Sequence, residues 1–180
     1  MFGTRQRSYQ SPAAYATEAD VYQFFEKDMD RLYTLSLLLT ADYYLAERCF
    51  VGGLDDASDG NCVFRDWLQS WATRTVIQNA IRLMQPRPGD GLTTHGEALT
   101  NLPAELAAVS ELPAFDRFAF VLSVLERYSD RECAVLLKCT GADVFAARSR
   151  ALRCLGHAAE LRDPQLGSGL PGPVAFSAHN

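Results

Sequence analysis

The chain of 180 residues is long enough for one medium-sized domain or two small ones, and 48% of its residues are hydrophobic, so a buried core can form. No apolar run approaches the roughly 18 residues that a membrane span needs, so we predict no membrane-spanning segment. Arg5 and Arg7 near the N-terminus are not followed by an apolar stretch, which argues against a secretory signal. We therefore expect an intracellular, cytoplasmic protein.

The net charge of −5 hides an alternation of acidic and basic blocks along the chain. Residues 17–60 hold ten acids against three bases, and residues 88–116 hold five acids and no base. Residues 61–87 and 117–162 each carry a net charge of +3. Basic blocks permit contact with nucleic acid but do not demand it, since solvated helix faces have a similar composition.

The five cysteines fit neither a disulfide framework nor a zinc site. Their number is odd, and no two of them have the C-x-x-C spacing. Because Cys62, Cys133 and Cys154 stand among apolar neighbours at helical spacing, we expect buried, reduced thiols, as is usual in a cytosolic protein. We predict no bound metal and no cofactor.

Apolar residues spaced three or four apart predict helices in the first part of the chain. One helix is expected over residues 18–40, with Thr17 as its N-cap and Asp20 placed close to a capping box. A second is expected over residues 42–51, where Gly52 and Gly53 would end it and a polar loop would follow.

A third helix is expected from near Asn61 to just before Pro86, and it completes a helical domain over residues 18–85. Its apolar side includes Trp67 and Trp71, for which we expect positions in the core. Residues 1–17 are predicted to be a disordered lead. Prolines and glycines mark residues 86–111 as a flexible linker, with one short helix near its end.

A second helical domain is predicted over residues 112–162. It opens at Pro113, since proline suits the first turn of a helix. Ser129 followed by Glu132 predicts a capping box at the start of a further helix. After a short turn, Thr140 is expected to cap a last helix that reaches about Leu161.

The overall expectation is an all-α protein of two small domains, with a disordered Gly/Pro/Ser-rich tail over residues 163–180. In the second domain, a helix, a short turn and an arginine-rich helix follow one another. This layout is typical of a DNA-binding helix-turn-helix, although short helical hairpins are also common in other all-helical proteins.

Three groups of residues carry a more specific similarity. The first group is Asp30-Arg31-Leu32-Tyr33, Leu37-Leu38-Leu39-Thr40 and Ala46-Glu47. The second is Phe64-Arg65-Asp66-Trp67-Leu68, followed by Ala72. The third is Leu112-Pro113, Arg117, Leu122, Glu126, Ser129, Glu132, Ala134, Leu136-Leu137 and Val144.

In this order the groups resemble the core-binding region, the promoter-melting helix and the C-terminal helix-turn-helix of bacterial extracytoplasmic-function sigma factors, of the sigma-70 family. The resemblance implies a sigma region 2-like domain over residues 18–85 and a sigma region 4-like domain over residues 112–162. It implies a transcription initiation factor that binds core RNA polymerase and promoter DNA. It implies no cofactor and no catalytic chemistry, and an inhibitory protein is a further candidate partner.

The chain departs from the family at the positions that make contacts. Where the family has Asp-Leu-Val-Gln-Glu for the polymerase clamp, this chain has Arg48-Cys49-Phe50-Val51-Gly52. The start of the last helix, Asp143-Val144-Phe145-Ala146-Ala147, is apolar or acidic where the family has basic or polar residues. An alternative function is therefore a protein-interaction or regulatory module that kept the fold and lost promoter activity.

The resemblance and the residue chemistry together select the candidate contact residues. A melted strand offers phosphates and unstacked bases, which cations and amide or aromatic groups can bind. The candidates for it are Arg65, Arg74, Gln78, Asn79 and Arg82. The candidates for duplex DNA are Thr140, Arg148, Arg150 and Arg153. The candidates for polymerase are Asp42, Glu47, Arg48 and Val51.

Catalysis is not expected, because it requires groups held within mutual reach. His95, His157 and His179 lack a Cys or Asp at ligand spacing. We therefore predict that the protein is not an enzyme.

Overall fold

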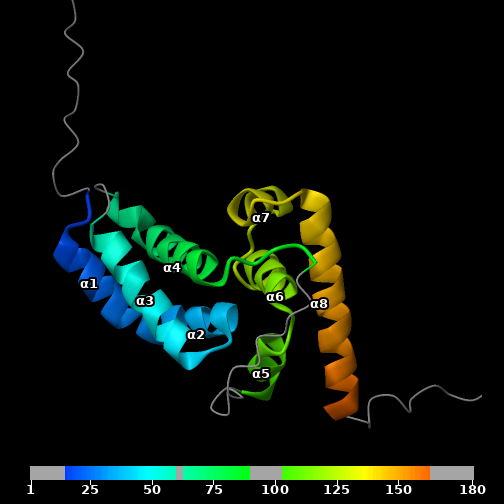
Figure 1. Cartoon of the computed structure of the whole chain (residues 1–180). Helices are drawn as coiled ribbons and strands as arrows, with labels where there is room; N and C mark the ends of the chain where they lie inside the picture. The colour runs from blue at the N-terminus through cyan, green and yellow to red at the C-terminus, as the bar shows by residue number, and fades with distance from the viewer. Residues whose placement is uncertain (1–14, 60–62, 90–102, 163–180) are drawn as a thin grey trace, which may run out of the picture.

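The computed structural model describes residues 15–59, 63–89 and 103–162, and these form helices and no strand (Figure 1). The predicted all-α class is confirmed. The tails, Asn61 and Cys62, His95 and most of the predicted linker lie outside the described residues.

The first group of helices comprises α1 (Glu18–Lys27), α2 (Met29–Thr40), α3 (Tyr43–Ser58) and α4 (Leu68–Met84), with a 3-10 turn η2 (Arg65–Trp67) before α4. Helix α3 contacts the other three helices. Thr17 caps α1 as predicted, and with Asp20 it forms a complete capping box.

Two boundaries in this group differ from the prediction. The expected helix over residues 18–40 is broken at Asp28, whose backbone angles (φ −106°, ψ 17°) are not helical. Helix α3 does not end at Gly52 and Gly53 but runs on to Ser58. A Cβ at Gly53 would lie 2.8 Å from Val76 Cγ2 and 3.1 Å from Val76 Cα. The glycine thus serves the close approach of α3 to α4, and not a helix stop.

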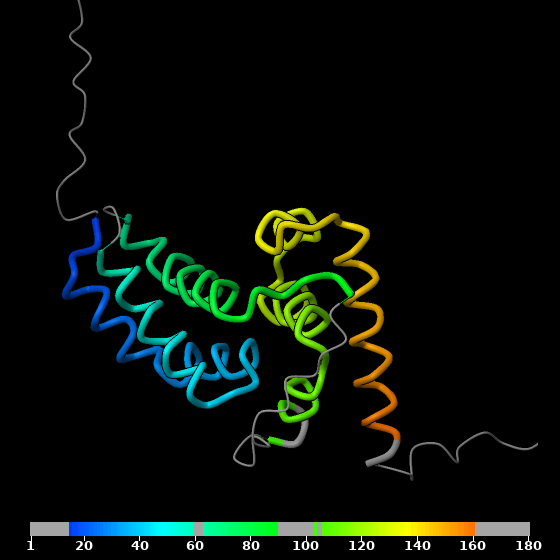
Figure 2. Tube along the Cα trace, viewed as in Figure 1, coloured from blue at the N-terminus to red at the C-terminus, as the bar shows by residue number. Residues whose placement is uncertain are grey.

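The second group comprises α5 (Ala104–Ser110), α6 (Ala114–Phe120), the π-helical turn η3 (Val121–Leu125), α7 (Asp130–Leu137) and α8 (Gly141–Arg162). Helix α8 packs on α6 and α7 and lies at one edge of the molecule (Figure 2). The capping box at Ser129 forms as predicted, and Thr140 caps α8 in the same way through Asp143. Lys138, in the left-handed conformation (φ 53°), ends α7.

The two groups share one hydrophobic core, which includes Phe25, Leu32, Leu39, Ile77, Phe115, Phe118, Leu122 and Val144. Helix α2 makes the connection, because it contacts both α5 and α6. The division of the chain into two independent domains stays a prediction.

Arg117 lies inside this connection, and its side chain is fully buried. Its guanidinium donates hydrogen bonds to the carbonyl oxygens of Leu39 (3.2 Å) and Thr40 (3.4 Å), at the end of α2. It also donates to the carbonyls of Ser110 (3.0 Å) and Leu112 (2.9 Å), at and just after the end of α5. Burial lowers the pKa of Arg117 to about 10, so the group stays protonated at neutral pH.

Candidate functional site

The candidate residues on η2 and α4 do not share one surface. Arg65 pairs with Asp20 at the start of α1, at 2.9 Å. Asn79 donates to Asp56 of α3 at 2.9 Å, and Arg82 pairs with the same carboxylate. Arg65, Asn79 and Arg82, three of the five candidates, therefore bind acidic side chains of neighbouring helices. The spacing of residues along α4 alone does not predict these contacts.

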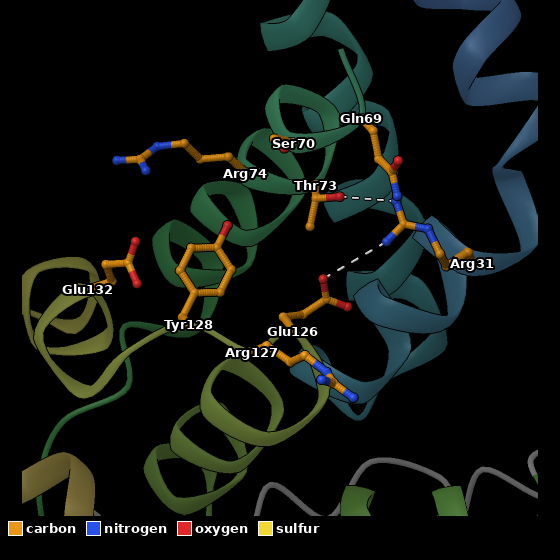
Figure 3. Close-up of a pocket in the computed structure, with 9 residues that line it drawn as sticks. All are labelled: Arg31, Gln69, Ser70, Thr73, Arg74, Glu126, Arg127, Tyr128 and Glu132. Atoms are coloured by element: carbon orange, nitrogen blue, oxygen red, sulfur yellow. Dashed lines mark hydrogen bonds and ion pairs between the residues drawn. The ribbon is translucent and has the colours of Figure 1, made fainter. Parts of the chain in front are cut away.

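Arg74 is the arginine of α4 that has no hydrogen bond or ion pair to any described residue. It lines a polar groove of about 440 Å³ between α4 and the segment that leads into α7 (Figure 3). Gln78, one turn further on, is half-buried. Arg74 is thus the candidate on α4 that remains free to meet a phosphate.

Arg31 links the two helix groups across the same groove. It donates to Asp28 at 2.6 Å. Figure 3 shows its contacts with Thr73 Oγ1 (3.0 Å) and with the carboxylate of Glu126 (3.9 Å). Burial raises the pKa of Glu126, although the charge of Arg31 opposes this shift. The groove is therefore lined by charges of both signs.

The two tryptophans differ in exposure. Trp67 is 64% exposed, so its predicted core position is wrong. It packs edge-on against Phe64, which in turn stacks on Tyr15. Trp71 is partly buried against the core, and its indole nitrogen has no partner among the described residues. A short 3-10 turn before α4 turns Trp67 away from the apolar stripe of that helix.

The candidates on α8 are largely engaged within the chain. Thr140 caps the helix, since its hydroxyl accepts from the Asp143 amide at 3.2 Å. Arg148 pairs with Asp130 of α7. Arg150 donates two hydrogen bonds to Asp116 of α6, at 3.0 and 2.6 Å. These bonds raise the pKa of Arg150.

Arg153 is exposed and has no ion-pair partner among the described residues. Exposed ion pairs contribute only about 0–1 kcal/mol each, so Arg65 and Arg82 can exchange a carboxylate for a phosphate at little cost. The side chain of Arg148 is only 24% exposed and makes two hydrogen bonds to Asp130, so it is held more firmly. Arg150 differs because its partner Asp116 is only 7% exposed. Removing Arg150 from that carboxylate would leave a buried charge without a partner.

Arg150→Ala is therefore expected to lower the free energy of unfolding by about 2 kcal/mol, because buried Asp116 loses its hydrogen bonds. Arg153→Ala, on the same helix, is expected to change it by less than about 0.5 kcal/mol. Urea unfolding followed by circular dichroism measures both values. Equal effects of the two substitutions would show that Arg150 does not support Asp116.

The polymerase candidates on α3 fall into two classes. Asp42 is the N-cap, and its carboxylate accepts from the Leu45 amide at 2.8 Å, so its role is structural. Glu47, Arg48 and Val51 are exposed on the outward side of α3. Tyr44, which the sequence did not suggest, belongs to the same side, with the Arg48 guanidinium 5.7 Å from its ring centre.

The two buried cysteines of the described residues are protonated thiols. Burial raises the pKa of the Cys49 and Cys133 thiols to about 11, so neither ionises near neutral pH. Cys154 is exposed, contrary to the prediction. Within the described ranges, no cluster of three or more His, Cys, Asp and Glu could hold a metal ion. None of the helices in these ranges is long and apolar enough to cross a membrane.

Comparison of the chain with protein-family models, with curated proteins and with solved structures finds no match.

Proposed function

We propose that this chain is a sigma-like transcription initiation factor that binds core RNA polymerase and promoter DNA. The observation that carries the proposal is the pair α7 and α8. The two helices contact each other, both begin with a capping box, and only Lys138, Cys139 and Thr140 separate them. A helix-turn-helix has this kind of connection, with the second helix lying in the major groove.

Duplex binding in this proposal relies on phosphates more than on bases. Arg153 is free and Arg148 is held by a partly exposed ion pair. The first exposed residues of α8, Gly141, Ala142 and Phe145, carry no donor that could read a base edge. Arginine contacts to phosphates position a protein on DNA, so we expect weak sequence preference.

Polymerase binding is assigned to the outward side of α3, where Glu47, Arg48 and Val51 are exposed beside Tyr44. In the family that the sequence resembles, this region presents carboxylates to the polymerase. A positive charge at Arg48 then opposes binding, while Glu47 favours it. Neither side chain contributes to the core, so both can be changed without loss of the fold.

The test measures the affinity of the labelled full chain for purified bacterial core RNA polymerase. Glu47→Lys is expected to weaken binding roughly fivefold and Arg48→Glu to strengthen it by a similar factor, since one exposed charge pair contributes up to about 1 kcal/mol. Glu111→Lys makes the same change of charge beyond α5 and is expected to have no effect. Affinities that follow net charge alone, with Glu111→Lys as weak as Glu47→Lys, would contradict this assignment.

A second candidate function, a protein-interaction module without promoter activity, is favoured by two observations. Arg65, Arg82, Arg148 and Arg150 all bind carboxylates of this chain. The last helix exposes Phe145 and Leu152, which suit an apolar partner better than DNA. A native chain that does not bind core polymerase at all would make this candidate the leading one.

A further inference from the structure

Helix α8 carries a stripe of alternating large and small residues, of which Ser149 is half-buried and the other three are exposed. Phe145 is 60% and Leu152 49% exposed, and Ser149 and Gly156 lie between and beyond them. Steps of four, three and four residues place all four on one face of the helix. The face that packs on the core is a different one, formed by Val144, Ala147 and Ala151. Figure 1 shows α8 at the edge of the molecule, with the other helices on one side of it.

When a second α8 lies antiparallel to the first, the large residues of each stripe face the small residues of the other. Along α8 the stripe runs large, small, large, small, and an antiparallel copy runs small, large, small, large. In the register that centres on the Arg150–Ala151 bond, Phe145 meets Gly156 of the second copy, and Leu152 meets Ser149. A Cβ on Gly156 would have no atom within 4 Å, so the space that Phe145 needs is open. We propose that α8 pairs with α8 of a second copy of this chain in this antiparallel register.

The charges around the stripe leave one repulsion in this pairing. The four central residues are uncharged, and Arg148, at one edge, is neutralised by Asp130. Arg153, beside Leu152, has no ion-pair partner among the described residues, so the two copies of Arg153 repel each other and weaken the contact.

The Arg148 guanidinium lies 5.6 Å from the ring centre of Phe145, so the ring is held before any partner arrives. In the proposed register Glu160 of one copy lies beside Gly141 of the other, at the positive end of the helix dipole, and antiparallel dipoles attract.

The contact between the two α8 helices buries a small area, so we expect a low affinity. One helix packed on one helix buries less than the roughly 1,200–2,000 Å² of a stable interface, so the dimer is weak and reversible. Pairing covers the face of α8 that would approach a duplex, so dimerisation and duplex binding exclude one another. The inference does not rest on the proposed function, because self-association is measured without DNA or polymerase.

Sedimentation equilibrium of the full chain, from about 10 µM to about 1 mM, is expected to show a monomer–dimer equilibrium. Phe145→Ala is expected to raise the dissociation constant by roughly tenfold or more, because it removes a buried ring from each copy. Tyr22→Ala, which removes a side chain of similar exposure (48%) from α1, is expected to leave it unchanged. A native chain that stays monomeric over the whole range would overturn the proposal.

An exchange of large and small residues tests the register. Gly156→Leu alone is expected to weaken the dimer roughly tenfold, because the introduced leucine side chain and Phe145 of the second copy compete for one space. The double variant Phe145→Ala with Gly156→Leu restores a large residue opposite a small one, and its dissociation constant is expected to return toward the native value. Circular dichroism confirms that each variant is folded. A double variant weaker than both single variants would rule out this pairing.

Discussion

Replacement of Arg117 by alanine is expected to lower the free energy of unfolding by about 4 kcal/mol, because several buried carbonyls lose their donor at once and each such loss costs about 1–3 kcal/mol. The bonds to the carbonyls of Leu39, Thr40 and Leu112 are buried, and the bond to the Ser110 carbonyl is partly buried. Urea unfolding followed by circular dichroism measures the loss.

Two control variants show whether the loss of stability comes from the hydrogen bonds of the guanidinium. Arg117→Lys keeps the charge but not the planar fork of donors, so it is expected to retain part of the stability. Arg131→Ala, at an exposed position on α7, is expected to change stability by less than about 0.5 kcal/mol. If Arg117→Ala is no more destabilising than Arg131→Ala, the hydrogen bonds of the guanidinium do not hold the two groups of helices together.

The same experiment tests the predicted two-domain division. Both tryptophans of the chain lie in the first group of helices, whereas Arg117 lies on α6 in the second. If the groups unfold together, Arg117→Ala shifts the unfolding midpoint seen by tryptophan fluorescence as much as the midpoint seen by circular dichroism. An unchanged fluorescence midpoint would show that residues 18–85 unfold as an independent domain.

Gly53→Leu is expected to lower the free energy of unfolding by about 3 kcal/mol, because a side chain here meets the backbone and side chain of Val76 and forces α3 away from α4. The neighbouring Gly52→Ala meets only the side-chain amide of Asn79. That amide must move and give up its hydrogen bonds to Asp56 and to the Thr75 carbonyl. Alanine favours the helix by about 1 kcal/mol, which offsets part of this cost, so Gly52→Ala is expected to be clearly less destabilising than Gly53→Leu. Thermal and urea unfolding compare the two, and equal losses would contradict the close approach at Gly53.

Local signals in the sequence predicted local structure well. The caps at Thr17, Ser129 and Thr140 depend on residues three apart, and all three form. The break at Asp28 was not predicted, since the apolar spacing continues across it. The role of Gly53 was not predicted either, because a glycine that allows two helices to approach looks the same in a sequence as one that ends a helix.

The candidate site was harder to predict because its ion pairs join residues that lie far apart in the sequence. Arg150 and Asp116 are 34 residues apart, and Arg82 and Asp56 are 26 apart. Only the packing of α8 on α6 and of α4 on α3 brings these partners together. Arg117 did carry a signal, because it stands with Asp116 among the apolar residues of α6, where an arginine must find acceptors inside the protein.

The burial of Arg117 has a consequence for the dependence of the fold on acidity. Its hydrogen-bond acceptors are carbonyls at and near the C-terminal ends of α2 and α5. The end of a helix carries roughly half a negative elementary charge, so the two ends together act as a counter-ion for the guanidinium. A carboxylate counter-ion is lost by protonation in acid, but these carbonyls do not titrate. The junction between the two groups of helices therefore keeps its charge balance for as long as α2 and α5 remain helical.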